Sequence, residues 1–200
     1  MNIWNIPTTA WMQKRLVERG AIGVSRFRAG LDPILTGVME PILARLPSGC
    51  VCEFGVSHGS TARFMREMSK AEIHLFDAFT QVDGIDEFLA TPEHLVLART
   101  GRWRVSTHKG LLPATLIGFA EPVSFAFVDL NDHGEVTQAV LEHIKPLLVS
   151  GASVILHDYG VPRFSVGIQR ASLSLAPERD WICLSDWGRS ALWRKKDNGK

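Results

Sequence analysis

CEFGVSHGST, residues 52–61, is the stretch of sequence that decides the fold. It joins an apolar run, Cys50–Phe54, to a loop that contains Gly55 and Gly59, and the loop leads into a helical pattern that begins at Ser60. Glycines let the chain turn sharply and let a ligand approach the backbone, while free amides at a helix start can hold an anionic group. A buried strand that ends in such a loop is typical of a ligand-binding site in an open parallel sheet.

Short apolar runs alternate with helical patterns on both sides of this loop. Continuous apolar runs suit strands that are covered on both faces. The strands are predicted at Cys50–Phe54, Ile73–Phe76, Trp103–Ser106, Phe125–Val128 and Ser153–Leu156, and helical segments at Ser60–Met68, Pro113–Phe119 and Val136–Leu147. This succession predicts an α/β fold with a doubly wound, mostly parallel sheet and helices on both faces.

The two ends of the chain follow different patterns. A helix is predicted at Ser165–Leu175, and residues 181–195, WICLSDWGRSALWRK, predict an antiparallel hairpin at the edge of the sheet. Apolar residues at helical spacing between Thr9 and Leu46 predict two or three helices ahead of the first strand. We therefore divide the chain into an N-terminal helical extension, residues 1–46, and one α/β domain, residues 47–196.

The composition limits the classes of partner. The chain has 200 residues, of which 46% are hydrophobic and 22% charged, enough for one compact domain with its own core. A net charge of +1 gives no long-range attraction to nucleic acid or to an anionic membrane, so neither partner is expected. Neither a signal peptide nor a run of about 18 apolar residues is present, which predicts a soluble cytoplasmic protein. Cys50 and Cys52 face the same side of a strand and are interpreted as buried thiols rather than a metal or redox pair.

Glu53 indicates which ligand the loop binds. A carboxylate two residues before Gly55 would repel the pyrophosphate of a nicotinamide dinucleotide. The loop pattern of that cofactor, G-x-G-x-x-G, is also absent, because three residues separate Gly55 from Gly59. Glu53 would attract an ammonium group, and Ser60 and Thr61 could hold a carboxylate at the helix start. The methionine end of S-adenosylmethionine carries both groups.

The second strand is followed by another acid, Asp77, 24 residues after Glu53. A carboxylate at this position can accept hydrogen bonds from both hydroxyls of a ribose. The plainer alternative is that Glu53 caps a turn and Asp77 merely ends a strand. The cofactor interpretation is favoured because the loop lies between the two acids in the expected strand order. It also places Phe54 at the loop and Lys109 and Gly110, after the third strand, beside the adenine.

These motifs resemble those of the class I, Rossmann-like methyltransferases that use S-adenosylmethionine, over about residues 48–194. The loop of that family, E-x-G-x-x-x-G, corresponds to Glu53, Gly55 and Gly59. The resemblance implies a seven-stranded sheet that finishes with an antiparallel strand, which SALWRK, residues 190–195, could supply.

Within that family, two phrases are similar to the macrocin and sugar O-methyltransferase group. One is Lys109-Gly110 followed by Thr115-Leu116, and the other runs from Leu141 to Tyr159. The resemblance implies O-methylation of a small hydroxylated metabolite, a sugar or a natural product. Two other functions stay open: a non-catalytic domain that binds S-adenosylmethionine, and methylation of nitrogen or of a macromolecule.

Polar residues also follow the fourth and fifth strands. Asp129 follows one, and His157 and Asp158 follow the other, so all three could meet at the same rim of the sheet. Three such ligands suit a divalent cation. In the resembling group acids at these strand ends hold Mg²⁺, whereas the imidazole of His157 favours Zn²⁺, Mn²⁺ or Fe²⁺. The alternative is a neutral, packed His157 with Asp158 capping the next turn.

Methyl transfer to a hydroxyl group also requires a base. His133 is the favoured residue, because a loop imidazole titrates near neutral pH. Asp132 and His157 are the next candidates, and a merely solvated His133 is the plainer alternative. The segment departs from the family pattern D-x-D-x-Y by one residue, which leaves open whether Asp129 or Asp132 is the equivalent catalytic acid.

Aromatic residues mark two further segments. Trp4 and Trp11 could form a partner surface, giving a homodimer through the N-terminal helices, or a lid over the acceptor pocket. A basic cluster, Arg99, Arg102 and Arg104 around Trp103, is interpreted as a solvated face with the tryptophan at an apolar strand position.

Overall fold

The structure is a computed structural model of the chain, and it describes residues 33–80, 91–130, 134–162, 165–175, 181–186 and 190–196. Two predicted features lie outside these ranges. They are the tryptophan surface of the first 32 residues and the candidate base segment with Asp132 and His133.

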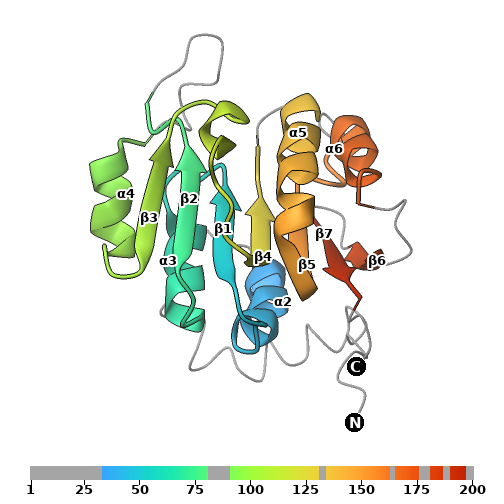
Figure 1. Cartoon of the computed structure of the whole chain (residues 1–200), viewed down its shortest axis with the longest axis horizontal. Helices are drawn as coiled ribbons and strands as arrows, with labels where there is room; N and C mark the ends of the chain where they lie inside the picture. Colours follow the sequence, from blue (N-terminus) through green and yellow to red (C-terminus); the bar gives the residue numbers. More distant parts are fainter. Residues whose placement is uncertain are drawn as a thin grey trace.

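One seven-stranded sheet forms the centre of the fold (Figure 1). Its order is β3-β2-β1-β4-β5-β7-β6, and the neighbouring strands from β3 through β5 are parallel. Strand β7 is antiparallel to both β5 and β6. The predicted mostly parallel sheet with an antiparallel C-terminal pair is therefore confirmed. The strands are β1 Cys50–Phe54, β2 Ile73–Asp77, β3 Val105–Lys109, β4 Val123–Val128, β5 Leu148–His157, β6 Trp181–Asp186 and β7 Ser190–Lys195.

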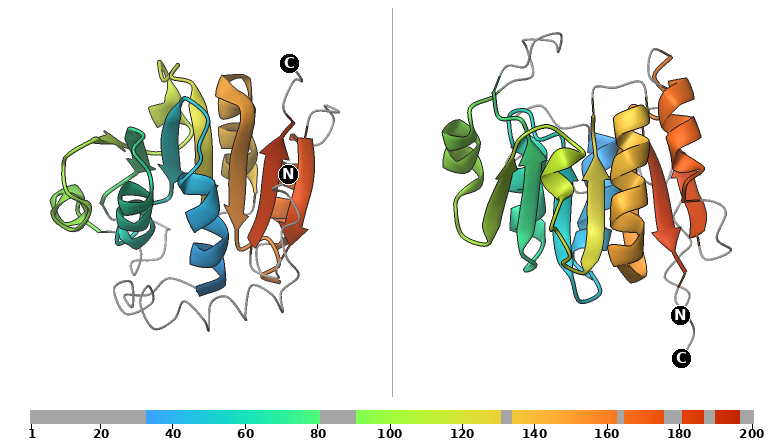
Figure 2. Two further views of the ribbon diagram at one scale, coloured as in Figure 1. Left: turned by 90° about the horizontal axis from the view of Figure 1, so that it is seen from below. Right: turned by 45° about the horizontal axis from the view of Figure 1, so that its top comes forward.

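Helices cover both faces of this sheet (Figures 1 and 2). Helices α2 (Pro33–Leu43) and α3 (Ser60–Met68) pack on one face, and α5 (Glu135–Ile144) and α6 (Ser165–Ser172) pack on the other. Helix α4 (Glu93–Thr100) lies beside the β3 edge (Figure 1). Both faces of the sheet are therefore apolar, as the unbroken hydrophobic runs of the strands predict.

Strand β1 shows how the sequence builds two cores. Val51 packs in the core under α2 and α3, whereas Cys50, Cys52 and Phe54 pack in the core under α5 and α6. Side chains alternate along a strand, so five consecutive buried residues serve both faces. The two cysteines are buried with their sulfurs 3.8 Å apart, so they lie on one side of the strand, as predicted.

The first strand, its loop and helix α3 match the prediction residue for residue, but the third strand does not. The third strand runs Val105–Lys109. Arg104 has a left-handed backbone with φ 58°, so the strand begins after it, later than the apolar pattern predicts. Trp103 is 69% exposed and lies 4.1 Å from the guanidinium of Arg104. Arg104 also donates to the carbonyls of Ser69 and Ala71, so it is a structural residue rather than part of a solvated face.

Between β2 and β4, one predicted helix is wrong and one observed helix was missed. The segment Pro113–Phe119 holds only a short 3-10 turn at Ala114–Leu116, since seven residues that end near Gly118, with φ 86°, are too few for a stable helix. Helix α4 was not predicted, although Pro92 before Glu93 is a helix-start signal. In the described part of the chain, no helix has the length and apolar character needed to cross a membrane.

Candidate functional site

The carboxyl ends of β1, β2, β4 and β5 meet at one edge of the sheet, where the strand order reverses between β1 and β4. Each of these strands delivers a polar residue to that edge: Glu53, Asp77, Asp129 and His157. The residues predicted from four separate segments therefore do share one rim.

The glycine loop turns from β1 against the end of β4. Gly55 has φ 83°, and a Cβ there would lie 2.0 Å from the carbonyl oxygen of Asp129. Gly59 has φ 77°, and a Cβ there would lie 2.9 Å from Val96 on α4. Both glycines are needed because the backbone makes close approaches that no side chain would permit. Gly59 also begins α3 without a side-chain cap, so the amides near Ser60 have no capping side chain of their own.

The side chain of Asp77, the last residue of β2, holds this loop through hydrogen bonds. Its Oδ2 accepts hydrogen bonds from the backbone amides of Val56 (2.7 Å) and Ser57 (3.2 Å), and its Oδ1 accepts one from Phe79 (2.9 Å). Each carboxylate oxygen has two lone pairs, so further hydrogen bonds from a ligand remain possible. Asp77 thus has a positioning role that the sequence did not indicate.

Helix α4 and Thr91, two residues before it, support the loop from outside. His58 Nδ1 pairs with the hydroxyl of Thr91 at 2.6 Å, and Arg99 donates to the carbonyl of His58 at 3.0 Å. Sequence reasoning missed Thr91 and Arg99 as supports, because they lie 33 and 41 residues from His58 and no local pattern joins them.

Glu53 is the most unusual residue of the site. It is 1% exposed, and its Oε2 has no hydrogen-bond partner among the described residues. Burial raises the pKa of its carboxyl group well above the usual 4.5, and the charges of Asp129 and Asp77 raise the pKa further. An ionised carboxylate without a partner is costly to bury. A positive charge bound beside Glu53 would therefore stabilise its ionised form.

This raised pKa predicts how stability depends on pH in the absence of a ligand. The folded protein holds the Glu53 proton more tightly than the unfolded chain, so the stabilising effect is complete below about pH 4.5 and is lost as pH rises through the folded-state pKa. Removing the charge in Glu53→Gln should therefore raise the melting temperature at neutral pH and have little effect near pH 4. Thermal unfolding of both proteins across this range checks the prediction, and parallel curves would contradict it.

Asp129, His157 and Asp158 form a second cluster beside Glu53, as predicted. Each offers one donor atom, and the three atoms lie within 4.8 Å of one another. His157 Nδ1 lies 3.1 Å from Asp129 Oδ1 and 3.3 Å from Asp158 Oδ1, yet this buried nitrogen makes no aligned hydrogen bond within the described ranges. Burial lowers the pKa of His157, but the two carboxylates outweigh burial and raise the pKa to about 9. The two carboxylates thus favour a protonated ring over the alternative of a neutral, packed His157.

Backbone strain is concentrated at the same edge. Ser57, Phe79 and Asp158 follow β1, β2 and β5, and all three adopt left-handed φ angles of 47°, 50° and 53°. Such conformations cost on the order of 1–3 kcal/mol each and gather at ligand sites. Their position agrees with a site at the carboxyl ends of the strands.

The remaining predicted residues fall into two groups. Lys109 pairs in register with Asp77, and the Gly110 amide donates to the Asp77 carbonyl at 3.0 Å, so both lie at the site. The Phe54 side chain is fully buried and stacks on Phe76 with ring centroids 4.9 Å apart, which leaves only its backbone next to the loop.

Comparison with known proteins gives the family. A family model described as a methyltransferase domain matches residues 52–159, more than half of the chain. No curated protein matches the sequence.

Solved structures share the fold at low sequence identity. The O-methyltransferase NovP is 17% identical with a TM-score of 0.66, and the match covers 81% of this chain and 79% of that one. The calicheamicin methyltransferase CalS11 is 19% identical with a TM-score of 0.61, over 94% and 93% of the two chains. An O-methyltransferase from Bacillus cereus, solved in complex with SAH, is 17% identical with a TM-score of 0.61, over 96% and 93%.

Proposed function

This chain belongs to the methyltransferase-domain family, and we propose that it transfers the methyl group of S-adenosylmethionine to a hydroxyl group of a small acceptor, a sugar or a natural product. The observation that carries the proposal is the buried carboxyl group of Glu53 beside the glycine loop, whose Oε2 has no hydrogen-bond partner among the described residues. S-adenosylmethionine supplies an ammonium group, the positive charge that Glu53 requires, on a tail whose carboxylate suits the start of α3.

The described contacts support a position for each part of the cofactor. The ammonium group binds Glu53, the loop of Gly55 and Gly59 bends around the amino-acid tail, and its carboxylate lies at Ser60 and Thr61. Asp77 keeps acceptor capacity for the ribose hydroxyls after its three backbone hydrogen bonds. The adenine lies beside Lys109 and Gly110, at the end of the neighbouring strand β3.

The sulfonium of the cofactor is an activated donor, so the protein has to align the acceptor and remove its proton. We assign the base to the segment that begins at Asp129, with His133 as the first candidate and Asp132 and Asp129 as alternatives. The backbone of Asp129 lies against Gly55, so this segment starts directly beside the cofactor loop. His157 is a poor base in the ligand-free protein, because a pKa of about 9 keeps its ring protonated at neutral pH.

A divalent metal fits the cluster of Asp129, His157 and Asp158. One nitrogen and two carboxylate oxygens converge within 4.8 Å, and the buried His157 nitrogen lacks a hydrogen bond inside the described region. Nitrogen with oxygen donors favours Mn²⁺, Fe²⁺ or Zn²⁺ over Mg²⁺. A metal held there would orient the acceptor and lower the pKa of its hydroxyl group.

Removal of this metal should abolish most of the activity. EDTA is expected to reduce the rate of methyl transfer at least ~10-fold, because both orientation and hydroxyl activation would be lost. Mn²⁺ should restore the rate, and Asp158→Asn should need more Mn²⁺ for the same rate. Binding of S-adenosylmethionine should change little. An unchanged rate after exhaustive chelation would remove the metal from the proposal.

The proposed function is tested in two steps. Calorimetry with S-adenosylmethionine should show one binding site, and transfer of labelled methyl from the cofactor to a panel of hydroxylated sugars and natural products should identify the acceptor. The methyl resonance of the product distinguishes an O-methyl from an N-methyl group. Binding without transfer to any acceptor class would instead support a non-catalytic cofactor-binding domain.

A further inference from the structure

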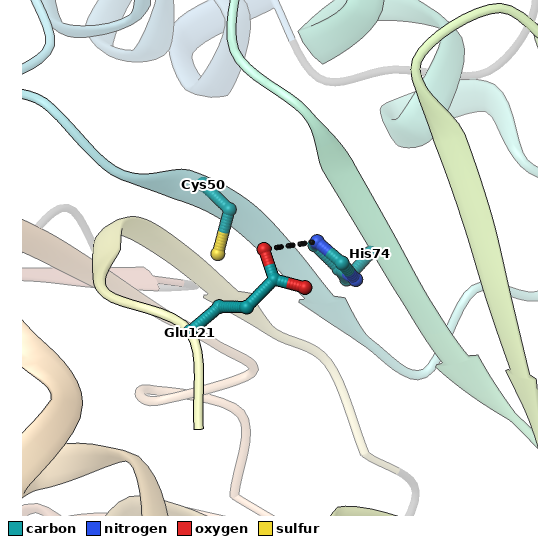
Figure 3. Close-up of side chains that lie close together, drawn as sticks. All are labelled: Cys50, His74 and Glu121. Carbon is teal, nitrogen blue, oxygen red and sulfur yellow. Dashed lines mark ion pairs between the residues drawn. The ribbon is translucent and has the colours of Figure 1, made fainter. Parts of the chain in front are cut away.

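Three potential metal ligands lie close together (Figure 3), at the end of the sheet opposite to the glycine loop. Cys50 is the first residue of β1, His74 is the second of β2, and Glu121 lies two residues before β4. All three are therefore at the amino ends of parallel strands, whereas the proposed active site is at the carboxyl ends.

The donor atoms already lie at metal-binding separations. The sulfur of Cys50, a ring nitrogen of His74 and a carboxylate oxygen of Glu121 are all within 4.8 Å of one another. His74 Nε2 lies 3.3 Å from Glu121 Oε2. Two ligands that are each about 2.0–2.1 Å from a tetrahedral zinc ion are about 3.3–3.4 Å apart, so this pair needs almost no movement to bind one.

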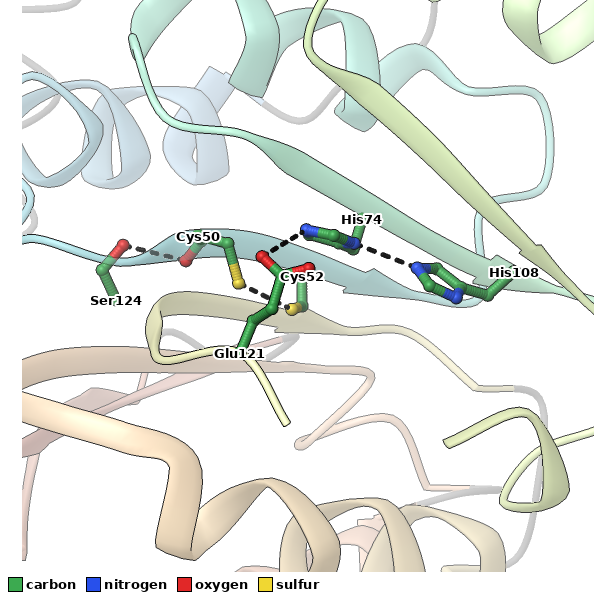
Figure 4. A network of polar contacts seen from close by, with 6 residues as sticks. All are labelled: Cys50, Cys52, His74, His108, Glu121 and Ser124. Atoms are coloured by element: carbon green, nitrogen blue, oxygen red, sulfur yellow. Dashed lines mark hydrogen bonds and ion pairs between the residues drawn. The ribbon is translucent and has the colours of Figure 1, made fainter. Parts of the chain in front are cut away.

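His74 points its Nε2 into the cluster, toward Glu121 (Figure 3). The residue is 6% exposed, and Nε2 has no hydrogen-bond partner in the described part of the chain. The other nitrogen, Nδ1, is hydrogen-bonded to His108 Nε2 at 3.0 Å (Figure 4). A metal-binding histidine is commonly oriented in this way, with its second nitrogen held by an outer partner.

Cys50 offers its sulfur atom to the cluster. The sulfur of Cys52 lies 3.8 Å from that of Cys50 and is its hydrogen-bond partner (Figure 4). The thiolate is the form of cysteine that binds metals.

The backbone around Cys50 holds the cluster in place. The Cys50 amide donates to the carbonyl of Pro122 at 2.8 Å, and the hydroxyl of Ser124 donates to the Cys50 carbonyl at 2.9 Å (Figure 4). Both partners are in the segment that carries Glu121, so its backbone is fixed relative to β1.

We propose that Cys50 Sγ, His74 Nε2 and the carboxylate of Glu121 bind a divalent transition metal, with Zn²⁺ as the preferred ion and water as the fourth ligand. Sulfur, imidazole and carboxylate are the donors that zinc takes in proteins. The ion ties together β1, β2 and the segment before β4, and it thereby stabilises the sheet at the edge that the cofactor does not reach. Cys52 and His108 act as positioning residues for the ligands.

The absorption spectrum of bound Co²⁺ distinguishes this site from the proposed active-site metal. The reduced, metal-free protein is titrated with Co²⁺, and the site should produce a thiolate-to-cobalt charge-transfer band that Zn²⁺ then removes. The cluster of Asp129, His157 and Asp158 contains no sulfur and cannot produce that band. Asp158→Asn is therefore the matched control and should keep it.

Glu121→Gln is the decisive variant, because Glu121 is 56% exposed at its side chain and its replacement should not disturb folding. Loss of this ligand should weaken Zn²⁺ binding at least ~10-fold, since even outer-shell changes cost that much. The metal-free melting temperature should stay at the wild-type value, and Zn²⁺ should raise that of the wild type by more than that of Glu121→Gln.

Two cysteine variants test the ligand assignment. Cys50→Ser should lose the cobalt band, and Cys52→Ser should keep it, because a hydroxyl group can replace the donated hydrogen bond. Absence of the band from the wild type would overturn the proposal and leave only a hydrogen-bonded network. A band that persists in Cys50→Ser, or that is lost in Cys52→Ser or in Asp158→Asn, would overturn the assignment as well.

Discussion

Glu53→Gln is expected to weaken the binding of S-adenosylmethionine by about 2–3 kcal/mol, roughly 30- to 150-fold in Kd. The change removes one negative charge and almost no volume, so the loss measures the attraction between the carboxylate and the ammonium group. Glu53 is 1% exposed, and little solvent screening weakens that attraction. Isothermal calorimetry at neutral pH measures the change.

Binding of the cofactor should release a proton from the wild-type protein. Burial holds the pKa of Glu53 well above 4.5 in the free protein, and a bound ammonium group favours the ionised form, so binding releases a proton. The affinity for the cofactor should therefore rise with pH through the free-protein pKa of Glu53. Calorimetry in buffers of different ionisation enthalpy should detect the released proton in the wild type and a smaller release in Glu53→Gln.

Glu67→Gln is the matched control for this variant. It makes the same chemical change on α3, at a surface pair with Arg63 (2.9 Å) that is worth at most about 0.5 kcal/mol. Its affinity for the cofactor should equal that of the wild type. If Glu53→Gln also bound the cofactor with wild-type affinity, the proposed position of the ammonium group would be wrong.

Gly55→Ala is expected to destabilise the fold by about 3 kcal/mol or more. An alanine there would have to adopt φ 83°, and its Cβ would lie 2.0 Å from the Asp129 carbonyl oxygen. Relief of that clash requires β1 and β4 to separate at their carboxyl ends, where Glu53 and the cluster of Asp129, His157 and Asp158 lie. Chemical denaturation should show the loss, and the affinity for the cofactor should fall with it.

Gly118→Ala separates the two causes of this loss. Gly118 has nearly the same angle, φ 86°, but a Cβ there meets no described atom within 4 Å. It should therefore cost only the conformational penalty of about 1–2 kcal/mol. Equal destabilisation by the two variants would show that the close approach of the loop to Asp129 does not exist in solution.

The local elements of the site could be predicted from the sequence. Strand β1, its loop and helix α3 fall where the pattern places them, because a buried apolar run, two glycines and a helix start are all signals of short range. The meeting of Asp129 and His157 was also predictable, since parallel strands in a doubly wound sheet end at one rim. The third strand was misplaced because a left-handed backbone at Arg104 has no sequence signal in a residue that is not glycine.

The chain's sequence by itself thus determined the class of fold, the glycine loop and which acids stand at the strand ends. Only the tertiary structure decided the state of those residues. It buries Glu53 and leaves its Oε2 without a hydrogen-bond partner among the described residues, it bonds Asp77 to the loop, and it places His157 between two carboxylates. It alone also brought Cys50 to His74 and Glu121. Periodicity is a property of neighbours along the chain, whereas burial, charge and ligand geometry depend on segments that become neighbours only when the sheet forms.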